Sequence, residues 1–393
     1  MFKKTADLPS VKPKSTKKFK KIVITGGHHS SALPVIKKLR EKYANIEVFW
    51  FGHKYSMKGD RNPTLEYREI ESLNIPFFEL HAGKFYKTYD VFRLLKIPIG
   101  FIQALYLLLK LKPDIVMSFG GYLAVPVVIA AKILGIPALT HEQTVVVGYA
   151  NKLISKFADK VLISWESSKK YFKPGKVVLT GLPLREEVFV SNSDIFKINT
   201  VLPTVFVIAG KTGSHKINQV IEEGLKEILT KVNLIHQCGD HSVYKDFDVL
   251  SKKYDSIRDE VAGMFNLTKF VFSDSIGEAY KKADFIISRV GAHVAAEIIA
   301  LQKPAILIPI PWVSHNEQYE NAKIIQENIQ AEVLDEKNLT VKNLLLLIDK
   351  FAGLSSTGNA RNTAEIEYKV NNAAELILKE IIELSEKGSS QRF

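Results

Sequence analysis

Short apolar runs alternate with amphipathic stretches along most of the chain. In the first half, seven runs are typical of buried strands and cover residues 22–24, 48–51, 75–80, 115–117, 138–140, 161–163 and 177–179. Apolar residues at helical spacing predict helices over 33–43, 122–134 and 148–157. Apolar strands that are separated by helices indicate a parallel sheet covered on both faces.

The same alternation restarts after a polar stretch, which predicts a linker at 191–200. The second half contains predicted strands at 204–208, 234–237, 270–272, 285–287, 305–309 and 331–334. Predicted helices cover 217–229, 276–282, 294–301, 317–329 and 363–385. The fold class is therefore α/β, with two Rossmann-like, doubly wound parallel-sheet domains. Such domains bind ligands at the carboxyl ends of their strands, here in a cleft between the domains.

This pattern predicts five segments. A basic tail, predicted to be disordered, covers residues 1–20, and the first domain covers 21–190. The linker at 191–200 leads to the second domain at 201–362, and a helix and tail at 363–393 end the chain.

The net charge of +12 is concentrated in two segments of the 393-residue chain. Residues 1–21 carry +7 and residues 81–112 carry +5, so the remainder is neutral. This distribution argues against a nucleic-acid binder, whose positive charge covers a domain face. The single cysteine, Cys238, excludes a disulfide framework and favours a reducing, cytoplasmic location. No apolar run of signal-peptide length follows the basic start.

The second basic segment mixes cations with large apolar residues, and two interpretations stay open. Its charge-free run at 97–109 is too short to span a membrane. One interpretation is an amphipathic helix packed on the first sheet. The other is a surface whose apolar residues enter the lipid headgroup boundary while Lys and Arg meet anionic lipids.

The first candidate site is Thr25-Gly26-Gly27-His28-His29-Ser30-Ser31, which follows a strand and precedes a helix. Its glycines allow close approach of a ligand, and the helix start favours negative charge. The dinucleotide pattern G-x-G-x-x-G is absent, which argues against NAD or FAD. A histidine here offers a general base near pH 7. A tight turn whose serines cap the helix is the alternative.

The second candidate site combines Gly120-Gly121-Tyr122 with His141-Glu142-Gln143-Thr144. Both segments follow strands, so their polar groups are expected in one cleft, where they suit a hydroxyl-rich ligand such as a sugar. Half of a metal site and plain loop structure are the alternatives.

The third candidate site lies in the second half and suits a diphosphate. Lys211 and Thr212 lie in a glycine-rich loop, and Arg289 precedes the helix start at Gly291-Ala292. Backbone N–H groups and the helix dipole there can hold the anion. An NTPase phosphate loop is excluded because Val205 occupies the position of its first glycine.

Carboxylates complete this third site. Glu297 can accept hydrogen bonds from a ribose diol, and the alternative interpretation is that it is an exposed carboxylate on a helix. The next helix begins with a polar segment that includes Glu317, Gln318 and Asn321. The only Asp-x-Asp pair, at 246–248, is predicted to start a helix, so we expect neither a metal nor another cofactor.

These motifs, in this order, resemble the MurG-type glycosyltransferases. The resemblance covers residues 21 to about 380 and rests on six segments, namely Gly26-Gly27-His28, Gly120-Gly121-Tyr122, His141-Glu142-Gln143, Gly181-Leu182-Pro183-Leu184-Arg185, Gly291-Ala292 with Glu297, and Gln318 to Asn321. It implies a GT-B fold and inverting, metal-independent transfer of N-acetylglucosamine from UDP-GlcNAc to undecaprenyl-diphosphoryl-N-acetylmuramoyl-pentapeptide. It further implies peripheral binding to the cytoplasmic face of the cell membrane and a role in peptidoglycan precursor synthesis.

The resemblance also implies roles for individual residues. His28 resembles the catalytic base. The acceptor-binding positions would be Thr25, Gly26, Gly27, Gly121, Tyr122, His141, Glu142, Gln143 and Thr144. The donor-binding positions would be Arg185, Lys211, Thr212, Arg289, Gly291, Ala292, Glu297, Glu317, Gln318 and Asn321.

Several positions depart from the family pattern. The first loop is shorter than the family's Gly-Gly-Thr-Gly-Gly-His, and it is followed by His29-Ser30-Ser31 where the family usually has a Pro. Thr144 replaces an Asn, Glu317 replaces the first of two Gln, and Lys211-Thr212 replaces Ser-Gln. A transferase for another polyprenyl-diphosphate or glycolipid acceptor therefore stays open, as do a UDP-sugar or lipid-binding subunit without activity and a sugar epimerase.

Overall fold

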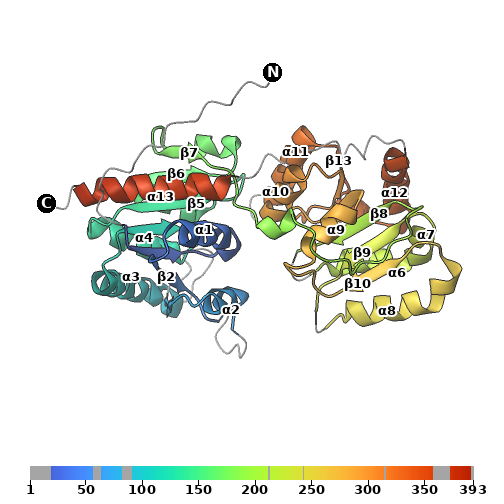
Figure 1. Cartoon of the computed structure of the whole chain (residues 1–393), viewed down its shortest axis with the longest axis horizontal. Helices are drawn as coiled ribbons and strands as arrows, with labels where there is room; N and C mark the ends of the chain where they lie inside the picture. Colours follow the sequence, from blue (N-terminus) through green and yellow to red (C-terminus); the bar gives the residue numbers. More distant parts are fainter. Residues whose placement is uncertain are drawn as a thin grey trace, which may run out of the picture.

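Two lobes, each built on one parallel sheet with helices on both faces, make up the molecule (Figure 1). The computed structural model describes residues 19–55, 63–81, 91–210, 213–241, 243–313, 316–356 and 372–390. The predicted tail at 1–20 falls almost wholly outside these ranges.

The first lobe contains a seven-stranded sheet in the order β3-β2-β1-β4-β5-β6-β7. Its strands are β1 (Lys21–Thr25), β2 (Glu47–Gly52), β3 (Phe77–Glu79), β4 (Ile115–Ser118), β5 (Ala138–Glu142), β6 (Lys160–Ile163) and β7 (Val177–Leu179). Its helices are α1 (His29–Lys42), α2 (Leu65–Ser72), α3 (Val91–Leu111), α4 (Ala124–Ile133) and α5 (Tyr149–Phe157).

Strand β1 shows why the sheet is covered on both faces. Ile22 and Ile24 pack in a cluster with α1, whereas Val23 packs in a second cluster with α3 and α4. All three side chains are fully buried, because successive residues of a strand point to opposite faces.

The second lobe contains a six-stranded sheet in the order β10-β9-β8-β11-β12-β13. Its strands are β8 (Thr204–Ile208), β9 (Asn233–Gln237), β10 (Phe265–Thr268), β11 (Phe285–Ser288), β12 (Ala305–Leu307) and β13 (Ala331–Val333). The remaining helices of the chain are α6 (His215–Glu223), α7 (Leu225–Leu229), α8 (Asp246–Ile257), α9 (Ile276–Lys282), α10 (Ala292–Ala300), α11 (Glu317–Asn328), α12 (Val341–Ser356) and α13 (Ala373–Ser390).

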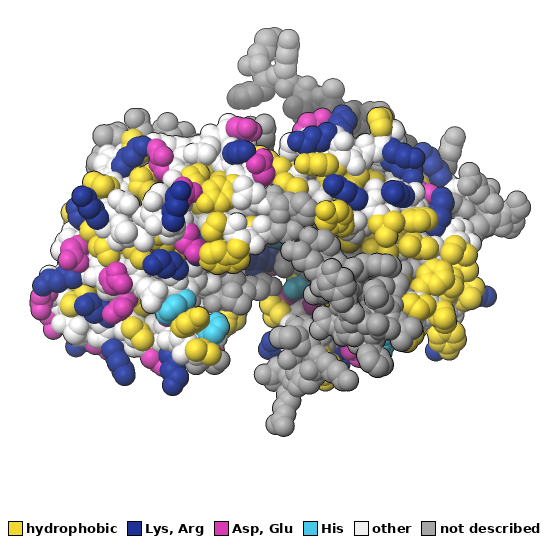
Figure 2. All heavy atoms as spheres, turned by 180° about the vertical axis from the view of Figure 1, so that it is seen from behind, with side chains coloured by type: hydrophobic (Ala, Val, Ile, Leu, Met, Phe, Trp, Pro, Cys, Tyr) yellow, Lys and Arg dark blue, Asp and Glu magenta, His cyan; other side chains and the backbone are white. Residues whose placement is uncertain are grey.

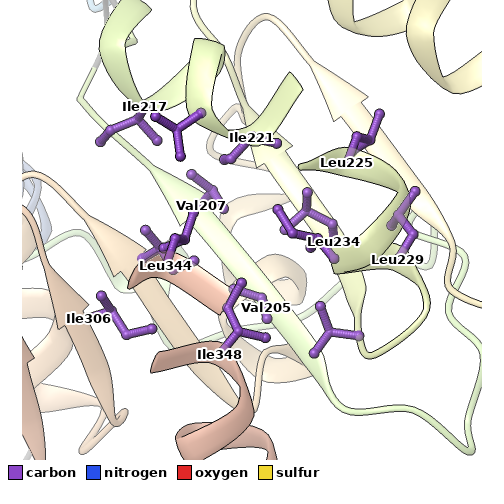
Figure 3. Packing of buried hydrophobic residues seen from close by; sticks show 14 of the residues in the cluster. Val205, Val207, Ile217, Ile221, Leu225, Leu229, Leu234, Ile306, Leu344 and Ile348 are labelled. Carbon is purple, nitrogen blue, oxygen red and sulfur yellow. The ribbon is translucent and has the colours of Figure 1, made fainter. Parts of the chain in front are cut away.

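The core of the second lobe follows the same rule. Val205 and Val207 pack against α6, α7 and α12, as Figure 3 shows. Phe206 and Ile208 face the other side, where α9, α10 and α11 cover the sheet. In both sheets the strand order reverses beside the central strand, between β1 and β4 and between β8 and β11, which is where ligands bind in such folds.

Helix α13 returns to the first lobe and lies across it (Figure 1). Its residues Ala374, Ile377 and Ile381 are buried in the cluster of the first sheet. Lys160 at the start of β6 forms ion pairs with Glu380 and Glu383 of this helix. The end of the chain thus stabilises the lobe in which the chain begins. The predicted helix at 363–385 matches α13 from residue 373 on, and its earlier part lies outside the described residues.

The two-domain prediction is confirmed, and one predicted strand is wrong. The strand expected at 270–272 lies instead at Phe265–Thr268, where it pairs with β9. Phe270 and Phe272 are exposed, and their rings lie 6.1 Å apart. Residues 265–268 alternate between apolar and polar side chains, whereas residues 270–272 form a continuous apolar run. Pairing with β9 decides between them, because Phe265 gains burial there.

Some helices were not predicted, namely α2, α12 and most of α8. The predicted helix at 217–229 is divided in two at Gly224. None of the helices in the described ranges combines the length and the apolar character that crossing a membrane requires. Around the predicted linker, Val188 and Phe196 both pack in the core of the second lobe.

Candidate active site

The loops after β1 and β4 are pressed together. The backbone N–H of Gly27 donates a hydrogen bond to the carbonyl oxygen of Gly120 over 3.1 Å. Gly26 has a φ of +134°, and a Cβ atom there would lie 2.8 Å from the same oxygen. Gly121 also has a positive φ, of +82°. Side chains are therefore excluded from this contact, which brings two of the predicted acceptor segments into one wall.

His28 lies at the end of the first loop, at the N-cap of α1, where its side chain makes no capping hydrogen bond. The residue is exposed to solvent, and it lines the cavity between the lobes. Desolvation by the surrounding protein lowers the pKa of His28, and the neighbouring His29 lowers it further. The imidazole is therefore neutral at pH 7, which is the form that a general base requires.

Helix α1 already begins at His29, so neither Ser30 nor Ser31 caps it as the alternative interpretation required. Ser31 instead lies 2.8 Å from Nε2 of His293, in α10 of the second lobe. Nε2 of His29 lies 2.6 Å from a carboxylate oxygen of Glu69 in α2.

Glu142 at the end of β5 is buried and holds the following loop. Its Oε1 accepts hydrogen bonds from the backbone N–H and the hydroxyl of Thr144, over 2.9 and 2.8 Å. Its Oε2 accepts one from Asn151 of α5 over 2.8 Å. Burial raises the pKa of Glu142, while these donors oppose the shift.

The neighbours of Glu142 point in different directions. His141 is fully buried, and its Nε2 lies 2.9 Å from the carbonyl oxygen of Gly181. Burial lowers the pKa of His141 to about 4, so the ring is neutral and braces the loop after β7. Gln143 is 2% exposed, and no described residue accepts a hydrogen bond from its Nε2. Its amide is thus a candidate to bind a ligand.

The other first-lobe residues lie behind the loops. Thr25 is fully buried, and no described residue bonds its Oγ1. Tyr122 is half-buried, with its ring 5.8 Å from that of His53. Burial raises the pKa of the Tyr122 hydroxyl, and Glu66 raises it further.

A cavity of about 310 Å³ joins the two lobes, and seven of the predicted residues line it. These are His28, Gly121, Glu142, Gln143, Thr144, Ala292 and Glu317. The same cavity is lined by five residues that the sequence analysis did not select, namely Val146, Gly148, Ala150, Asn151 and His293. Acceptor-side and donor-side positions therefore share one space.

Glu317 enters this cavity from the second lobe, at the first position of α11. Burial raises its pKa, and the charge of Glu142 on the opposite wall raises it further. Two carboxyl groups thus line the same cavity, and Glu142 is the one with three close hydrogen-bond donors.

The donor side centres on helix α10, which begins after Gly291. A Cβ atom on Gly291 would meet nothing within 4 Å, so the space before the helix start is open. Six residues after Gly291, Glu297 is buried and accepts a hydrogen bond of 2.7 Å from the hydroxyl of Tyr280. Arg185 approaches the other oxygen of Glu297 to 3.9 Å. Burial raises the pKa of Glu297, and Arg185 opposes this shift.

Arg289 is not in the cavity but is 6% exposed and fastens several loops together. Its guanidinium donates to Ser214 Oγ over 2.8 and 3.2 Å and to the carbonyl oxygen of Ile308 over 3.1 Å. It also forms an ion pair with Glu336. Arg289 therefore acts as a hydrogen-bond donor that holds the loop of Ser214 in place and does not line the cavity.

Gln318 and Asn321 hold the turn before α10. The Oε1 of Gln318 accepts hydrogen bonds from the backbone N–H groups of Val290 and Ile310, over 3.1 and 3.0 Å. Asn321 donates to the carbonyl oxygen of Val290 over 2.9 Å. Both side chains thus fix the backbone that leads to Gly291.

Lys211 and Thr212 lie outside the described residues. In the part of the chain that is described, no group of three or more His, Cys, Asp or Glu side chains is placed to hold a metal ion. The predicted helix start at 246–248 is confirmed, because α8 begins at Asp246.

Sequence reasoning missed Asn151, His293 and Tyr280. Asn151 lies in a helix, and its side chain reaches Glu142 only because α5 packs against β5. His293 directly follows the Gly291-Ala292 pair, and this position next to a predicted helix start was the one feature of the sequence that could have identified it. Tyr280 lies 17 positions from Glu297, and nothing in the sequence connects the two.

Comparison with known proteins agrees with this geometry. The Glycosyltransferase family 28 N-terminal domain matches residues 24–163, and the family's C-terminal domain matches residues 204–377. A UDP-N-acetylglucosamine--N-acetylmuramyl-(pentapeptide) pyrophosphoryl-undecaprenol N-acetylglucosamine transferase of Bacillus thuringiensis is 31% identical over 93% of this chain and 99% of its own length. This chain belongs to the MurG-type glycosyltransferases of family 28.

Further comparisons support the assignment of this chain to family 28. A transferase of the same description from Clostridium tetani is 33% identical over 83% of this chain and 88% of its own. The crystal structure of Acinetobacter baumannii MurG has a TM-score of 0.66 and 25% identity, and covers 93% of this chain and 99% of that one. UDP-GlcNAc 2-epimerase from Neisseria meningitidis, with a TM-score of 0.59 and 15% identity over 93% of this chain and all of its own, shares the fold alone.

Proposed function

We propose that this transferase moves N-acetylglucosamine from UDP-GlcNAc to undecaprenyl-diphosphoryl-N-acetylmuramoyl-pentapeptide, with inversion at the anomeric carbon. One observation carries the proposal. His28 of the first lobe and the start of α10 from the second lobe line the same cavity, so a base and an anion-binding helix end meet in one space.

His28 would take the proton of the acceptor hydroxyl. The acceptor oxygen then bonds to the anomeric carbon, and the bond from this carbon to the diphosphate of UDP breaks on the opposite side. The neutral state of His28 suits this step, because a base within reach of the hydroxyl must carry no proton beforehand.

The leaving diphosphate would bind at the start of α10. The N-terminus of a helix carries a partial positive charge, and its first N–H groups are unpaired. Open space in front of Gly291 leaves room for the anion. Glu297 would accept hydrogen bonds from the ribose diol, and Arg185 lies beside it. The amide of Gln143 would bind the sugar or acceptor from the opposite wall.

Helix α3 would carry the membrane-facing surface. Its buried side includes Ala104 and Leu108, so the first interpretation, a helix packed on the sheet, describes one of its faces. The other face exposes an apolar stripe of Ile99, Ile102, Tyr106 and Leu109, which are 53–64% exposed. Figure 2 shows apolar side chains gathered over this helix. Such a stripe beside Lys110 suits the headgroup boundary of an anionic membrane.

The experiment incubates the chain with UDP-GlcNAc and the lipid-linked acceptor, and identifies the products by mass spectrometry. A lipid-linked disaccharide with free UDP is the expected result. A disaccharide on a different polyprenyl lipid would support the broader transferase instead. Formation of UDP-ManNAc would indicate an epimerase. Binding of UDP-GlcNAc without any turnover would indicate a subunit that has lost activity.

A further inference from the structure

A buried serine and a half-buried histidine connect the two lobes beside the cavity. The hydroxyl of Ser31, in the first turn of α1, lies 2.8 Å from Nε2 of His293, in the first turn of α10. Ser31 is fully buried, and His293 lines the cavity together with His28. The two residues are 262 positions apart in the sequence, so only the packing of the lobes brings them together.

Each of the two residues lies close in the sequence to a proposed functional position. Ser31 lies three residues after His28, which is under one helical turn or about 4.5 Å along the axis. His293 lies two residues after Gly291. This hydrogen bond therefore joins the helix that begins at the proposed base to the helix whose start would bind the diphosphate.

Other contacts between α1 and the second lobe are weaker. Lys37 and Lys38 form ion pairs of 2.5 and 3.0 Å with Glu186, next to Val188, which packs in the second core. These three charged side chains are about one-third to one-half exposed, and such ion pairs contribute little to stability. The Ser31–His293 bond is fully buried at its Ser31 end and partly buried at its His293 end, so loss of His293 would leave the buried Ser31 hydroxyl without this partner.

We propose that Ser31 and His293 are positioning residues, whose hydrogen bond sets the distance between the base on α1 and the diphosphate site on α10. The inference rests on the proposed function. It predicts that loss of the bond lowers kcat and leaves the affinity for UDP unchanged, because the diphosphate site lies wholly in the second lobe.

The test is a double-mutant cycle with Ser31→Ala and His293→Leu. Each single variant is expected to lower kcat about tenfold, the scale on which one hydrogen bond acts. The double variant should be no slower than either single variant, because both remove the same bond. The Kd for UDP, measured by calorimetry, should stay within about twofold of wild type.

Two controls separate positioning from damage to the fold. His293→Gln keeps a hydrogen-bonding atom near the Nε2 position and should restore most of kcat. Ser30→Ala, next to Ser31 on α1, should behave as wild type. Effects that multiply in the double variant would overturn the inference, and so would a His293→Gln variant as slow as His293→Leu.

A readout without turnover separates this inference from the proposed function. Small-angle X-ray scattering should show a larger radius of gyration for Ser31→Ala and His293→Leu than for wild type and His293→Gln. If wild type transfers no sugar but these differences are found, the proposed function fails and the contact between lobes stands. If wild type transfers sugar and all variants scatter alike, the inference fails.

Discussion

At the scale of single residues, some polar side chains of the cleft hold its loops in place and others line its cavity. Glu142 and Arg289 have charged side chains, and the hydrogen bonds of each hold the loops around it in place. His28, Gln143 and Glu317 line the cavity, and Glu142 lines it as well. The sequence identified all five residues, but only the structure shows that Arg289 holds loops outside the cavity and that Glu142 both holds a loop and lines the cavity.

His28 should determine the acid side of the pH profile. Its pKa lies below the usual histidine value, so the neutral base persists as the pH falls below neutrality and is lost only below that lowered pKa. We expect kcat to be flat around pH 7 and to fall in acid. In His28→Ala, kcat should be about 10²–10⁴-fold lower and the acid limb should disappear. An unchanged acid limb in this variant would assign the base to another residue.

Glu297 should determine donor affinity. Glu297→Ala is expected to weaken UDP binding about tenfold, the scale of one lost charged hydrogen bond. Calorimetry with UDP measures this change. The matched control is Tyr280→Phe, which removes the hydroxyl behind Glu297 but leaves the carboxylate in place. Equal UDP affinity in Glu297→Ala and wild type would contradict the ribose-binding role.

At the scale of elements, the conformation of the first loop and the burial of helix α3 depend on which other elements they pack against. The sequence showed a glycine pair in the first loop, and the structure gives the reason, which is the contact with Gly120. For α3 the sequence left two interpretations open, and the structure shows that one face packs in the core of the first lobe. The strand expected at 270–272 failed because the sequence of a short apolar run contains no information about its pairing partner.

Gly26→Ala tests the loop contact. The added methyl group would meet backbone atoms at 2.8 Å, and the φ of +134° disfavours any side chain. We expect the free energy of unfolding to fall by about 1–3 kcal/mol or more. Chemical denaturation measures this change. Gly353→Ala in α12, where a Cβ atom meets nothing within 4 Å, should instead be neutral or stabilising. Equal stability of the two variants would contradict the close approach of the loops.

The exposed stripe of α3 should bind anionic vesicles. Ile102→Ser together with Tyr106→Ser removes two large apolar side chains from the stripe, and we expect vesicle affinity to fall at least tenfold. Sedimentation with vesicles that contain anionic lipid measures it. Leu346→Ser, which removes a side chain of similar exposure from α12 in the other lobe, is the control. Equal loss in both variants would mean that α3 is not the membrane-facing surface.

At the scale of the whole molecule, the alternation of strands and helices was enough to predict two parallel-sheet domains, because fully buried strands leave continuous apolar runs. The return of α13 to the first lobe was not predictable from its amphipathic pattern, since the pattern does not say which face it covers. The Ser31–His293 contact was equally hidden, because it depends on how the two lobes meet.

The most direct test of the central claim is a single-turnover assay with UDP-GlcNAc labelled in the sugar and the undecaprenyl-linked muramoyl-pentapeptide acceptor. Wild type is compared with His28→Ala at matched donor occupancy. We expect the label to move to the lipid in wild type, and we expect this transfer to be about 10²–10⁴-fold slower in the variant. Label that stays in the bound donor, or that appears in UDP-ManNAc, would contradict it.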